Sequence, residues 1–405
     1  MEWGRRPKRL GAAALALAAL VLPASGFAQT PRVEADARLR LQLTDEDGLD
    51  PAEALTLRVR AGAEIDIAPD TVVLGELEGA VALIDDFDDG TRFNALPFIP
   101  DPDGLELNRL QVATEAIPKT RITAGRQRIA IDDWRFFGTF PFRQNDQTVD
   151  GARVQVRDIG PIRATLDAGG FWQVNRPLGR NNPAGRFRGE SFYANLGFPT
   201  ALGRVSLFHY HFDIALRDTL PLPDHLSSAT TGARLFGRRH TEDASLVWEA
   251  AYARQVDAAD NPLDYATDYF LGELTGGWKG WNLTARAEEL GSDNGVGLTT
   301  PLASLHRFQG SADRFLMTPP DGVRDVSLAL ARDLDLPAPF ENGRALVRHH
   351  QFTAATDNRH YGSEWDASVS ARLGATRLSL EVADYHANGF ATDTRSVFVT
   401  AEWSF

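Results

Sequence analysis

The chain has 405 residues and a formal net charge of −13, with 42 Lys and Arg against 55 Asp and Glu. An acidic chain is a poor candidate for nucleic-acid binding, which relies on basic side chains that neutralise phosphates. The sequence has no cysteine, so disulfides are excluded as a source of stability. A mean hydropathy of −0.26 is typical of soluble proteins, but it also suits a transmembrane barrel, in which apolar and polar residues alternate along each strand.

The N-terminus has the layout of a secretory signal peptide. Basic residues between Arg5 and Arg9 precede 13 apolar residues, Leu10–Leu22, and small residues at Gly26 and Ala28 follow at the positions that signal peptidase reads. The apolar stretch is too short for a membrane-spanning helix, which needs about 20 residues. We therefore expect residues 1–28 to be a cleaved signal peptide and residues 29–405 to form one transmembrane β-barrel domain.

After residue 30 the dominant pattern is strict alternation of apolar and polar residues, which predicts strands with one apolar face. Residues 33–43 and 55–67 show it most clearly. About eighteen such segments of about ten residues are expected, the length of a tilted transmembrane strand. They are predicted at residues 33–43, 55–67, 71–84, 106–114, 120–130, 148–157, 162–174, 191–198, 204–213, 229–237, 244–254, 268–276, 280–290, 323–331, 342–352, 363–373, 376–386 and 395–405.

The connections between these segments alternate between short and long. Outer-membrane barrels have short periplasmic turns and longer extracellular loops, and the predicted connections follow that order. Residues 68–70 and 374–375 are examples of short turns, whereas the longest connection covers residues 291–322. The fold class expected is therefore all-β, an antiparallel outer-membrane β-barrel of about 18 strands, located in the outer membrane of a Gram-negative bacterium.

The final segment carries a signal for barrel assembly. Trp403 and Phe405 lie on the apolar face of the last predicted strand, and Phe405 is the last residue. A terminal aromatic residue on an alternating strand resembles the signal that the barrel-assembly machinery reads. We therefore expect this machinery, periplasmic chaperones, outer-membrane lipid and lipopolysaccharide to be partners of the chain.

Three stretches resemble a known family. The first runs from Gly125 to Trp134 and continues at residues 143–148, the second covers residues 300–310 with 318–322, and the third covers residues 385–395. They are similar to alginate-export-type outer-membrane proteins, in particular to the porin-like relatives of the alginate export channel. The resemblance implies a monomeric eighteen-strand barrel whose arginine-rich lumen passes anionic solutes.

The dedicated alginate channel of that family has a long periplasmic loop near its C-terminus that acts as a plug. Here the corresponding turn, near Gly374, is minimal. This departure argues against secretion of the polysaccharide itself, although export of an anionic polysaccharide stays an alternative at this stage.

Arginines on the inward parity of the early strands are the candidate solute-binding residues. The chain has 39 Arg and 3 Lys, and eight of these arginines lie at the alternate strand positions that are predicted to face the lumen. They are Arg38, Arg40, Arg58, Arg60, Arg109, Arg153, Arg157 and Arg163. Rings of arginine line anion pores, which predicts an anion-selective lumen. The structural alternative is that these arginines pair with lumen carboxylates across the strands and stabilise the wall.

The connection over residues 291–322 is too apolar to lie fully in water. We expect it either to fold into the lumen as a constriction or to pack over the mouth of the barrel. Its candidate constriction residues are Leu305, His306, Arg307, Phe308, Arg314 and Phe315. A plugged structural or adhesive barrel is the corresponding alternative function.

No motif in the sequence predicts an enzyme. Nucleophile-elbow, zinc-protease, P-loop and dinucleotide-binding motifs are all absent. Histidine is scattered along the chain, and the two pairs, His209 with His211 and His349 with His350, have no third ligand in view, so neither a metal nor a cofactor is expected. The function predicted is passive passage of small anionic solutes, such as carboxylates or uronates, through a porin-like channel.

Overall fold

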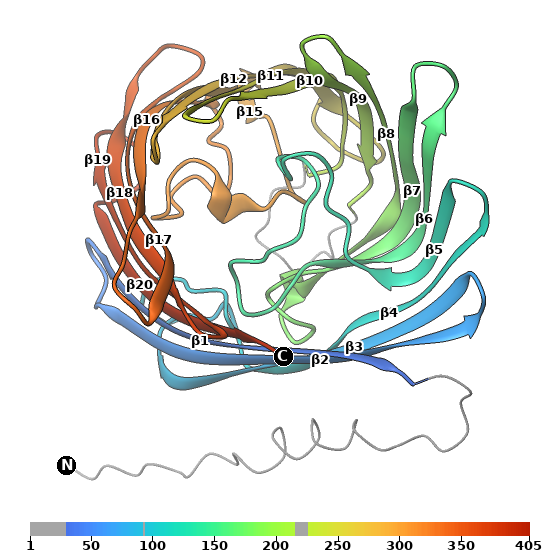
Figure 1. Ribbon diagram of the computed structural model, residues 1–405. Coiled ribbons are helices and arrows are strands. Elements are labelled where there is room, and N and C mark those ends of the chain that lie inside the picture. The colour runs from blue at the N-terminus through green and yellow to red at the C-terminus, as the bar shows by residue number, and fades with distance from the viewer. Residues whose placement is uncertain (1–29, 92–93, 215–225) are drawn as a thin grey trace.

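The computed structural model describes residues 30–91, 94–214 and 226–405. The expected signal peptide lies outside the described residues. In the described part, eighteen strands form one antiparallel sheet in which each strand pairs with its neighbours in sequence (Figure 1). The last strand also pairs with the first, from Asp36 opposite Ser404 to Glu46 opposite Thr394, and this pairing closes the barrel.

The barrel strands are β1 (Arg32–Glu46), β2 (Ala52–Ala68), β3 (Thr71–Asp86), β4 (Gly104–Ile117), β5 (Thr120–Gln127), β6 (Thr148–Ile159), β7 (Ala164–Asn175), β8 (Arg186–Thr200), β9 (Gly203–Phe212), β10 (Ser228–His240), β11 (Ala244–Asp257), β12 (Ala266–Trp278), β13 (Trp281–Leu290), β16 (Val323–Leu334), β17 (Phe340–Thr353), β18 (His360–Leu373), β19 (Thr376–Ala387) and β20 (Thr394–Ser404). Every predicted segment overlaps one of these strands, so the predicted fold class is confirmed. Two boundaries differ clearly from the prediction. β8 begins at Arg186, five residues before the predicted segment, and β5 ends at Gln127, because the chain turns into the barrel at Arg128.

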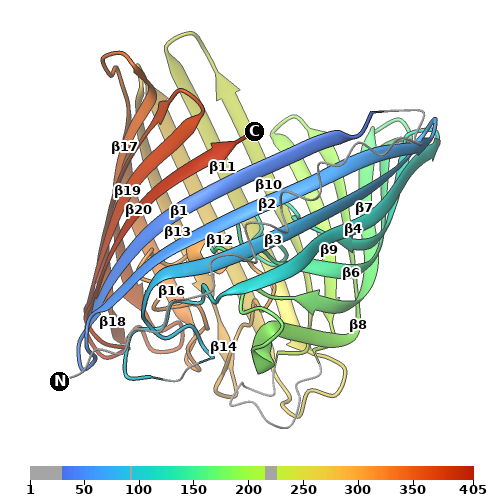
Figure 2. The same cartoon turned by 90° about the horizontal axis from the view of Figure 1, so that it is seen from below.

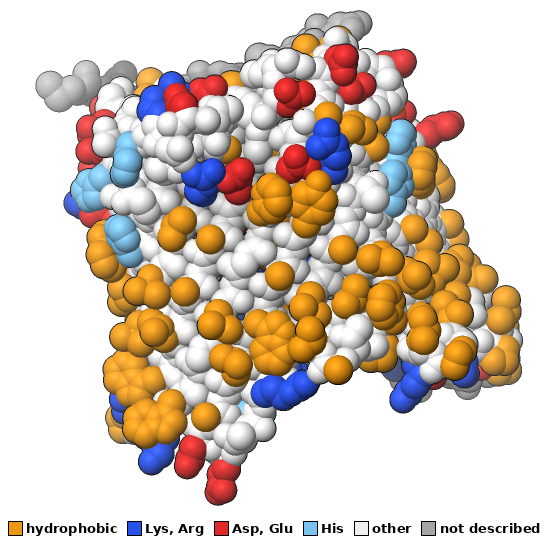
Figure 3. Space-filling view, turned by 90° about the horizontal axis from the view of Figure 1, so that it is seen from above, with side chains coloured by type: hydrophobic (Ala, Val, Ile, Leu, Met, Phe, Trp, Pro, Cys, Tyr) orange, Lys and Arg blue, Asp and Glu red, His pale blue; other side chains and the backbone are white. Residues whose placement is uncertain are grey.

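Alternation along each strand decides which side chains face the lumen. In β16, Val326, Leu328 and Leu330 are 50%, 55% and 46% exposed. Their neighbours Ala329 and Ala331 are buried inside the barrel. Apolar side chains therefore cover the outer face, and charged side chains gather toward its edges (Figure 3). An apolar outer surface of this extent is typical of contact with lipid.

The two rims of the barrel differ. At the short-turn rim, tight turns join β2 to β3, β12 to β13 and β18 to β19. The long-loop rim, at the opposite end, carries the extended connections (Figure 2). These contain the short elements η1 (Pro183–Gly185), β14 (Ser292–Asp293), β15 (Val296–Gly297) and η2 (Leu305–Arg307). The predicted alternation of short and long connections is therefore observed.

Candidate functional site

Two long connections fold into the lumen and are the main features of the candidate site. We call residues 128–147 the first inward loop and residues 291–322 the second inward loop (Figure 1). The loops contact each other directly. Gly138 donates its backbone N–H to the Leu302 carbonyl at 2.9 Å, and Ser304 donates to the Trp134 carbonyl at 3.1 Å. Because of these bonds, the two loops form one unit inside the barrel.

Aromatic side chains hold the first inward loop against β7–β12. The Phe136 ring lies 5.4 Å from the Phe208 ring and 5.0 Å from the Tyr269 ring, measured between centroids. Phe137 packs edge-on against Tyr193 at 5.3 Å. The lumen wall of an open porin is polar, so this apolar stretch of wall requires a covering element. The inward loop is that element.

Four of the predicted lumen arginines, Arg38, Arg40, Arg58 and Arg60, lie on the opposite side of the first inward loop, and we call them the arginine wall; three of them contact the loop. Arg38 donates to the carbonyls of Phe142 and Arg143, each at 3.1 Å, and Arg40 also donates to the Phe142 carbonyl. Arg60 lies 3.3 Å from Asp146.

Each residue of the arginine wall has a carboxylate or loop partner. Arg38 pairs with Glu402 at 2.6 Å, and Arg58 pairs with Asp36. The four residues face the lumen as predicted, but they are between 1% and 9% exposed because the loop covers them. They therefore support the first inward loop, and they do not line an open passage as the sequence analysis expected.

The other four predicted arginines lie in different surroundings. Arg109 pairs with Glu76, and Arg153 pairs with Asp167 inside the barrel. The Arg157 side chain is 63% exposed near the short-turn rim. Arg163 does not face the lumen from a strand: it lies in the turn between β6 and β7, with a φ of 51°, and its side chain is 76% exposed. The strand prediction failed there because β7 begins only after Gly160 and Pro161, at Ala164.

The second inward loop lies inside the lumen, which is one of the two arrangements expected from the sequence. Leu305, His306 and Arg307 form η2, and the His306 ring stacks on Phe142 of the first inward loop. Phe308 lies under the guanidinium of Arg135 at 4.6 Å. The loop is thereby tied to the first inward loop at both of these contacts.

The far end of the second inward loop contacts β1, β17 and the connection between β19 and β20. Arg314 pairs with Glu46 at 2.8 Å. Phe315 is 5% exposed and packs against Phe352 at 4.4 Å and Phe390 at 5.1 Å, measured between ring centroids. Of the candidate constriction residues, Phe308, Arg314 and Phe315 thus hold the loop in place.

A buried ion pair that the sequence analysis missed joins both loops to the wall. Arg135 contacts Glu288 of β13 at 2.9 Å, with side chains 2% and 0% exposed. Arg135 also donates to the Gln309 side chain at 3.1 Å, and Tyr269 donates to Glu288 at 2.6 Å. The signal that would have found it was available, because residues 128–147 mix aromatic and charged residues in the same way as residues 291–322.

Carboxylates of β18 support the second inward loop from the other side. Glu364 is fully buried and accepts the Ala312 backbone N–H at 2.8 Å. Gly310 fits over this carboxylate with a φ of +83°, and a Cβ added there would lie 2.4 Å from a Glu364 oxygen. The loop approaches the wall this closely because position 310 has no side chain.

Two aspartates of the inward loops have a pKa below the usual value although they are buried. Burial opposes ionisation of Asp146, but the guanidiniums of Arg128 and Arg60 outweigh this effect and hold its pKa below the usual value. Burial also opposes ionisation of Asp313, and the charges of His306 and Arg143 hold its pKa below the usual value in the same way. Both loops therefore carry ionised carboxylates that are held by basic side chains.

Several lumen-facing arginines form no salt bridge with a carboxylate of the described residues. Their lumen position follows from the register, in which Arg348 lies opposite Asp366 and Arg377 opposite Glu402. They are Arg204, Arg238, Arg348, Arg372 and Arg377. Among the lumen carboxylates of the described ranges, Glu364 and Glu381 also form no salt bridge with a basic side chain. The excess of unpaired positive charge lies toward the short-turn rim.

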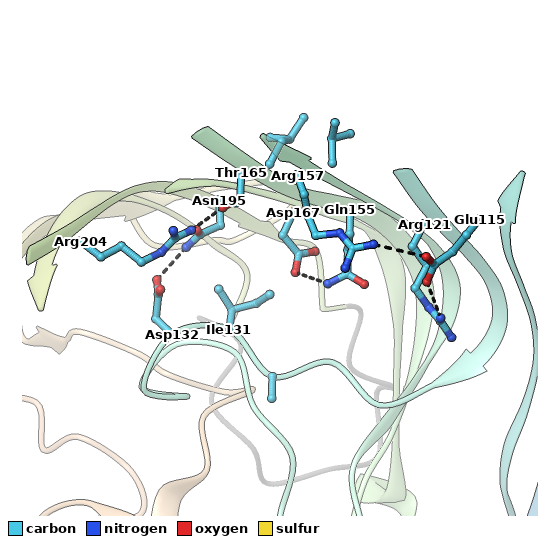
Figure 4. A pocket seen from close by; sticks show the side chains of 13 residues that line it. Glu115, Arg121, Ile131, Asp132, Gln155, Arg157, Thr165, Asp167, Asn195 and Arg204 are labelled. Carbon is cyan, nitrogen blue, oxygen red and sulfur yellow. Dashed lines mark hydrogen bonds and ion pairs between the residues drawn. The ribbon is translucent and has the colours of Figure 1, made fainter. Parts of the chain in front are cut away.

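A pocket of about 330 Å³ lies between the first inward loop and the wall, near the short-turn rim (Figure 4). We call it the turn-side pocket. It is lined by Glu115, Arg121, Ala130, Ile131, Asp132, Gln155, Val156, Arg157, Thr165, Leu166, Asp167, Asn195 and Arg204. Arg157 is the only predicted solute-binding residue among these lining residues.

Asp132 closes the turn-side pocket on the side of the first inward loop. Its carboxylate accepts hydrogen bonds from Asn195 at 2.6 Å and Ser206 at 3.0 Å, which fix the loop to β8 and β9. Burial raises the pKa of Asp132, and the nearby guanidinium of Arg234 only partly offsets this effect. The pocket is therefore bounded by both the barrel wall and the loop.

Two further kinds of feature are absent from the described residues. No helix among them is long and apolar enough to cross a membrane. No group of three or more His, Asp or Glu side chains in the described ranges is arranged to hold a metal ion.

Comparisons with protein-family models and with curated protein sequences find no match. Solved structures do match. The chain is similar to OpdL of Pseudomonas aeruginosa, with a TM-score of 0.65 and 14% identity over 93% of this chain and 98% of that one. It is similar to OccAB4 of Acinetobacter baumannii, with a TM-score of 0.69 and 12% identity over 93% and 98% of the two chains.

A third similar structure is that of OpdK of Pseudomonas aeruginosa with vanillate, with a TM-score of 0.65 and 17% identity over 92% of this chain and 98% of that one. OpdK is described as an outer-membrane protein. At these identities the likeness establishes architecture, and it gives no support to the alginate-export resemblance in particular. The chain thus has the closed eighteen-stranded β-barrel fold of the Opd and Occ outer-membrane proteins.

Proposed function

We propose that the chain is an outer-membrane channel through which small organic anions diffuse. The observation that carries this proposal is the unpaired positive charge on the lumen wall. Arg372 and Arg377 are direct cross-strand neighbours, and neither forms a salt bridge with a carboxylate of the described residues, although Arg377 also lies opposite Glu402. Like charges placed opposite one another destabilise a sheet, so their presence favours a role in attracting anions. OpdK, which shares the fold, has been solved with the carboxylate vanillate.

The apolar outer face supports a membrane location. Leucines and valines are widely exposed there, and Trp172, Trp278 and Trp365 are 60%, 61% and 52% exposed. Tryptophan is enriched where a membrane protein meets the lipid–water interface. We infer contact with outer-membrane lipid and lipopolysaccharide, recognition of Trp403 and Phe405 by the barrel-assembly machinery, and a monomeric channel without enzymatic activity.

Two alternative functions can be distinguished from the proposed channel by experiment. Export of an anionic polysaccharide requires a lumen that is open along its length, and the two joined inward loops disfavour it. A plugged structural or adhesive barrel would retain these loops in place at all times. The plugged barrel therefore predicts no steady passage of small ions through the isolated protein.

Single-channel recording in a planar bilayer tests the proposal. Under a KCl gradient, the refolded protein is expected to give steady conductance with a reversal potential that indicates anion preference. Replacing both arginines, Arg372→Gln and Arg377→Gln, should reduce this preference. The matched control is Arg254→Gln, which removes one exposed arginine from the outer face. A folded barrel without conductance would contradict the channel and favour a plugged barrel.

A further inference from the structure

We propose that the turn-side pocket is a binding subsite for small organic acids with two anionic groups; its role in transport rests on the proposed channel. The pocket lies behind the first inward loop, on the side of the short turns. A volume of about 330 Å³ falls at the lower end of the range of small-molecule sites, about 300–1,000 Å³. Its size therefore suits a compact solute.

The first cationic centre is Arg204 of β9. Its guanidinium extends across β8 and donates to the Thr165 hydroxyl of β7. It has no carboxylate partner among the described residues. The Arg204 side chain can cross β8 because position 197 is glycine. A Cβ added to Gly197 would lie 1.9 Å from Arg204 Nη2. The local sequence thus places an unpaired guanidinium in the pocket.

The second cationic centre is formed by Arg121 and Arg157. Arg121 contacts Glu115 at 2.9 Å, and Arg157 contacts the same carboxylate at 3.3 Å. Two guanidiniums sharing one carboxylate leave one positive charge uncompensated. All three side chains are between 38% and 63% exposed, so a solute can reach them.

The carboxylate between the two centres is already neutralised. Asp167 accepts from Arg153 at 2.9 Å, from Tyr193 at 3.0 Å and from Gln155 at 3.2 Å. In Figure 4 the guanidiniums of Arg204 and Arg157 lie on either side of Thr165 and Asp167. The remaining carboxylate of the lining, Asp132 on the loop side, accepts hydrogen bonds from Asn195 and Ser206 and lies 3.9 Å from Arg234. The pocket therefore presents two separated positive charges, and the carboxylates of its lining already have partners.

This arrangement favours a molecule that carries a carboxylate at each end. Guanidinium groups bind carboxylates with paired hydrogen bonds. Ala130 and Ile131 of the first inward loop add apolar lining, which suits a short carbon chain better than inorganic phosphate. A monocarboxylate of the same length would satisfy only one of the two centres.

Calorimetric titration of the detergent-folded full barrel tests the subsite, with succinate, butyrate and phosphate as probes. Succinate is expected to bind about tenfold or more tightly than butyrate, since one charge-assisted contact contributes at least about one factor of ten. Arg204→Gln should weaken succinate binding about tenfold and leave butyrate binding changed less. Arg239→Gln, which removes an exposed arginine from the outward face of β10, should change neither.

A second variant keeps the charge and displaces it. Gly197→Ala fills the space that the Arg204 guanidinium occupies, so it should weaken succinate binding although no charge is lost. Circular dichroism and the gel mobility of the unheated barrel verify folding of each variant. Equal binding of succinate and butyrate, or unchanged succinate binding in both variants, would overturn the subsite. Phosphate binding as tight as succinate binding would overturn the preference for organic acids.

Conductance in KCl without any organic acid separates this proposal from the proposed function. An anion-selective channel that binds succinate and butyrate equally refutes the subsite and leaves the channel intact. Selective succinate binding by a barrel that does not conduct supports the subsite and contradicts the channel.

Discussion

Replacing Arg135 by alanine should release both inward loops, because this side chain joins them to the barrel wall. Its guanidinium contacts the fully buried Glu288 at 2.9 Å and donates to Gln309 of the second inward loop. Removing one partner of a buried ion pair costs about 3–5 kcal/mol. Glu288 keeps Arg286 at 3.2 Å and Tyr269 at 2.6 Å, which places the cost at the lower end, about 3 kcal/mol.

A loss of about 3 kcal/mol raises the ratio of released to docked loops roughly a hundredfold, since each 1.4 kcal/mol is a factor of ten. Single-channel recording of Arg135→Ala should therefore show a high-conductance state far more often than the wild-type channel does. Limited proteolysis of the detergent-folded protein should cut within residues 128–147 and 291–322 at a correspondingly higher rate.

The control for this prediction is Arg254→Ala on the outer face. Arg254 pairs with Asp268 at 3.2 Å in an exposed position, and exposed pairs contribute little to stability. Conductance and proteolysis should be unchanged in this variant. If Arg135→Ala matches the wild-type protein in both measurements, the ion pair does not hold the loops, and the reasoning above is refuted.

Three further predictions concern the loops and the assembly of the barrel. Phe315→Ala removes a side chain that is 5% exposed from the contact with Phe352 and should destabilise the docked second inward loop by about 3 kcal/mol, seen as faster proteolysis of residues 291–322 and not of the strands. The pKa of Asp313 is held below its usual value, so its ionised carboxylate should contribute fully to loop docking at neutral pH, and this contribution should be lost as pH falls below about 4. The noise of the single-channel current should therefore rise at pH 3. The variant Asp313→Asn should show this higher noise both at neutral pH and at pH 3. Deletion of Phe405 should lower the amount of barrel in the outer membrane of expressing cells while refolding in detergent is retained; equal amounts in the membrane would show that Phe405 is not an assembly signal.

The strands were predictable because an alternating pattern of period two depends only on local sequence. Residues 33–43 and 55–67 show the pattern without interruption, and a barrel with an apolar outer face and a polar inner face requires it. Short and long connections were predictable for a similar reason, because two kinds of rim impose two loop lengths. The expected position of the second inward loop followed from its apolar residues, which water would not accommodate.

The surroundings of the lumen arginines were not predictable from alternation alone. The alternating pattern correctly places Arg38 and Arg60 on the inner face, but it does not indicate which residues cover them. The covering residues, Phe142 and Asp146, are about a hundred positions away in sequence. Arg204 was missed for a related reason, because its role depends on the space left by Gly197 on the neighbouring strand.

The pairing of β1 with β20 has a consequence for the kinetics of folding. Arg38 and Glu402, which meet at this seam, are 364 positions apart in sequence. Contacts of such long sequence separation form slowly, because the entropy of closing the loop between them must be lost before the contact can form. Until the seam closes, the apolar outer faces and the free strand edges of the chain are exposed together, and such intermediates aggregate. A chain with this topology is therefore most prone to aggregation when its strands are nearly complete but the seam between β1 and β20 is still open.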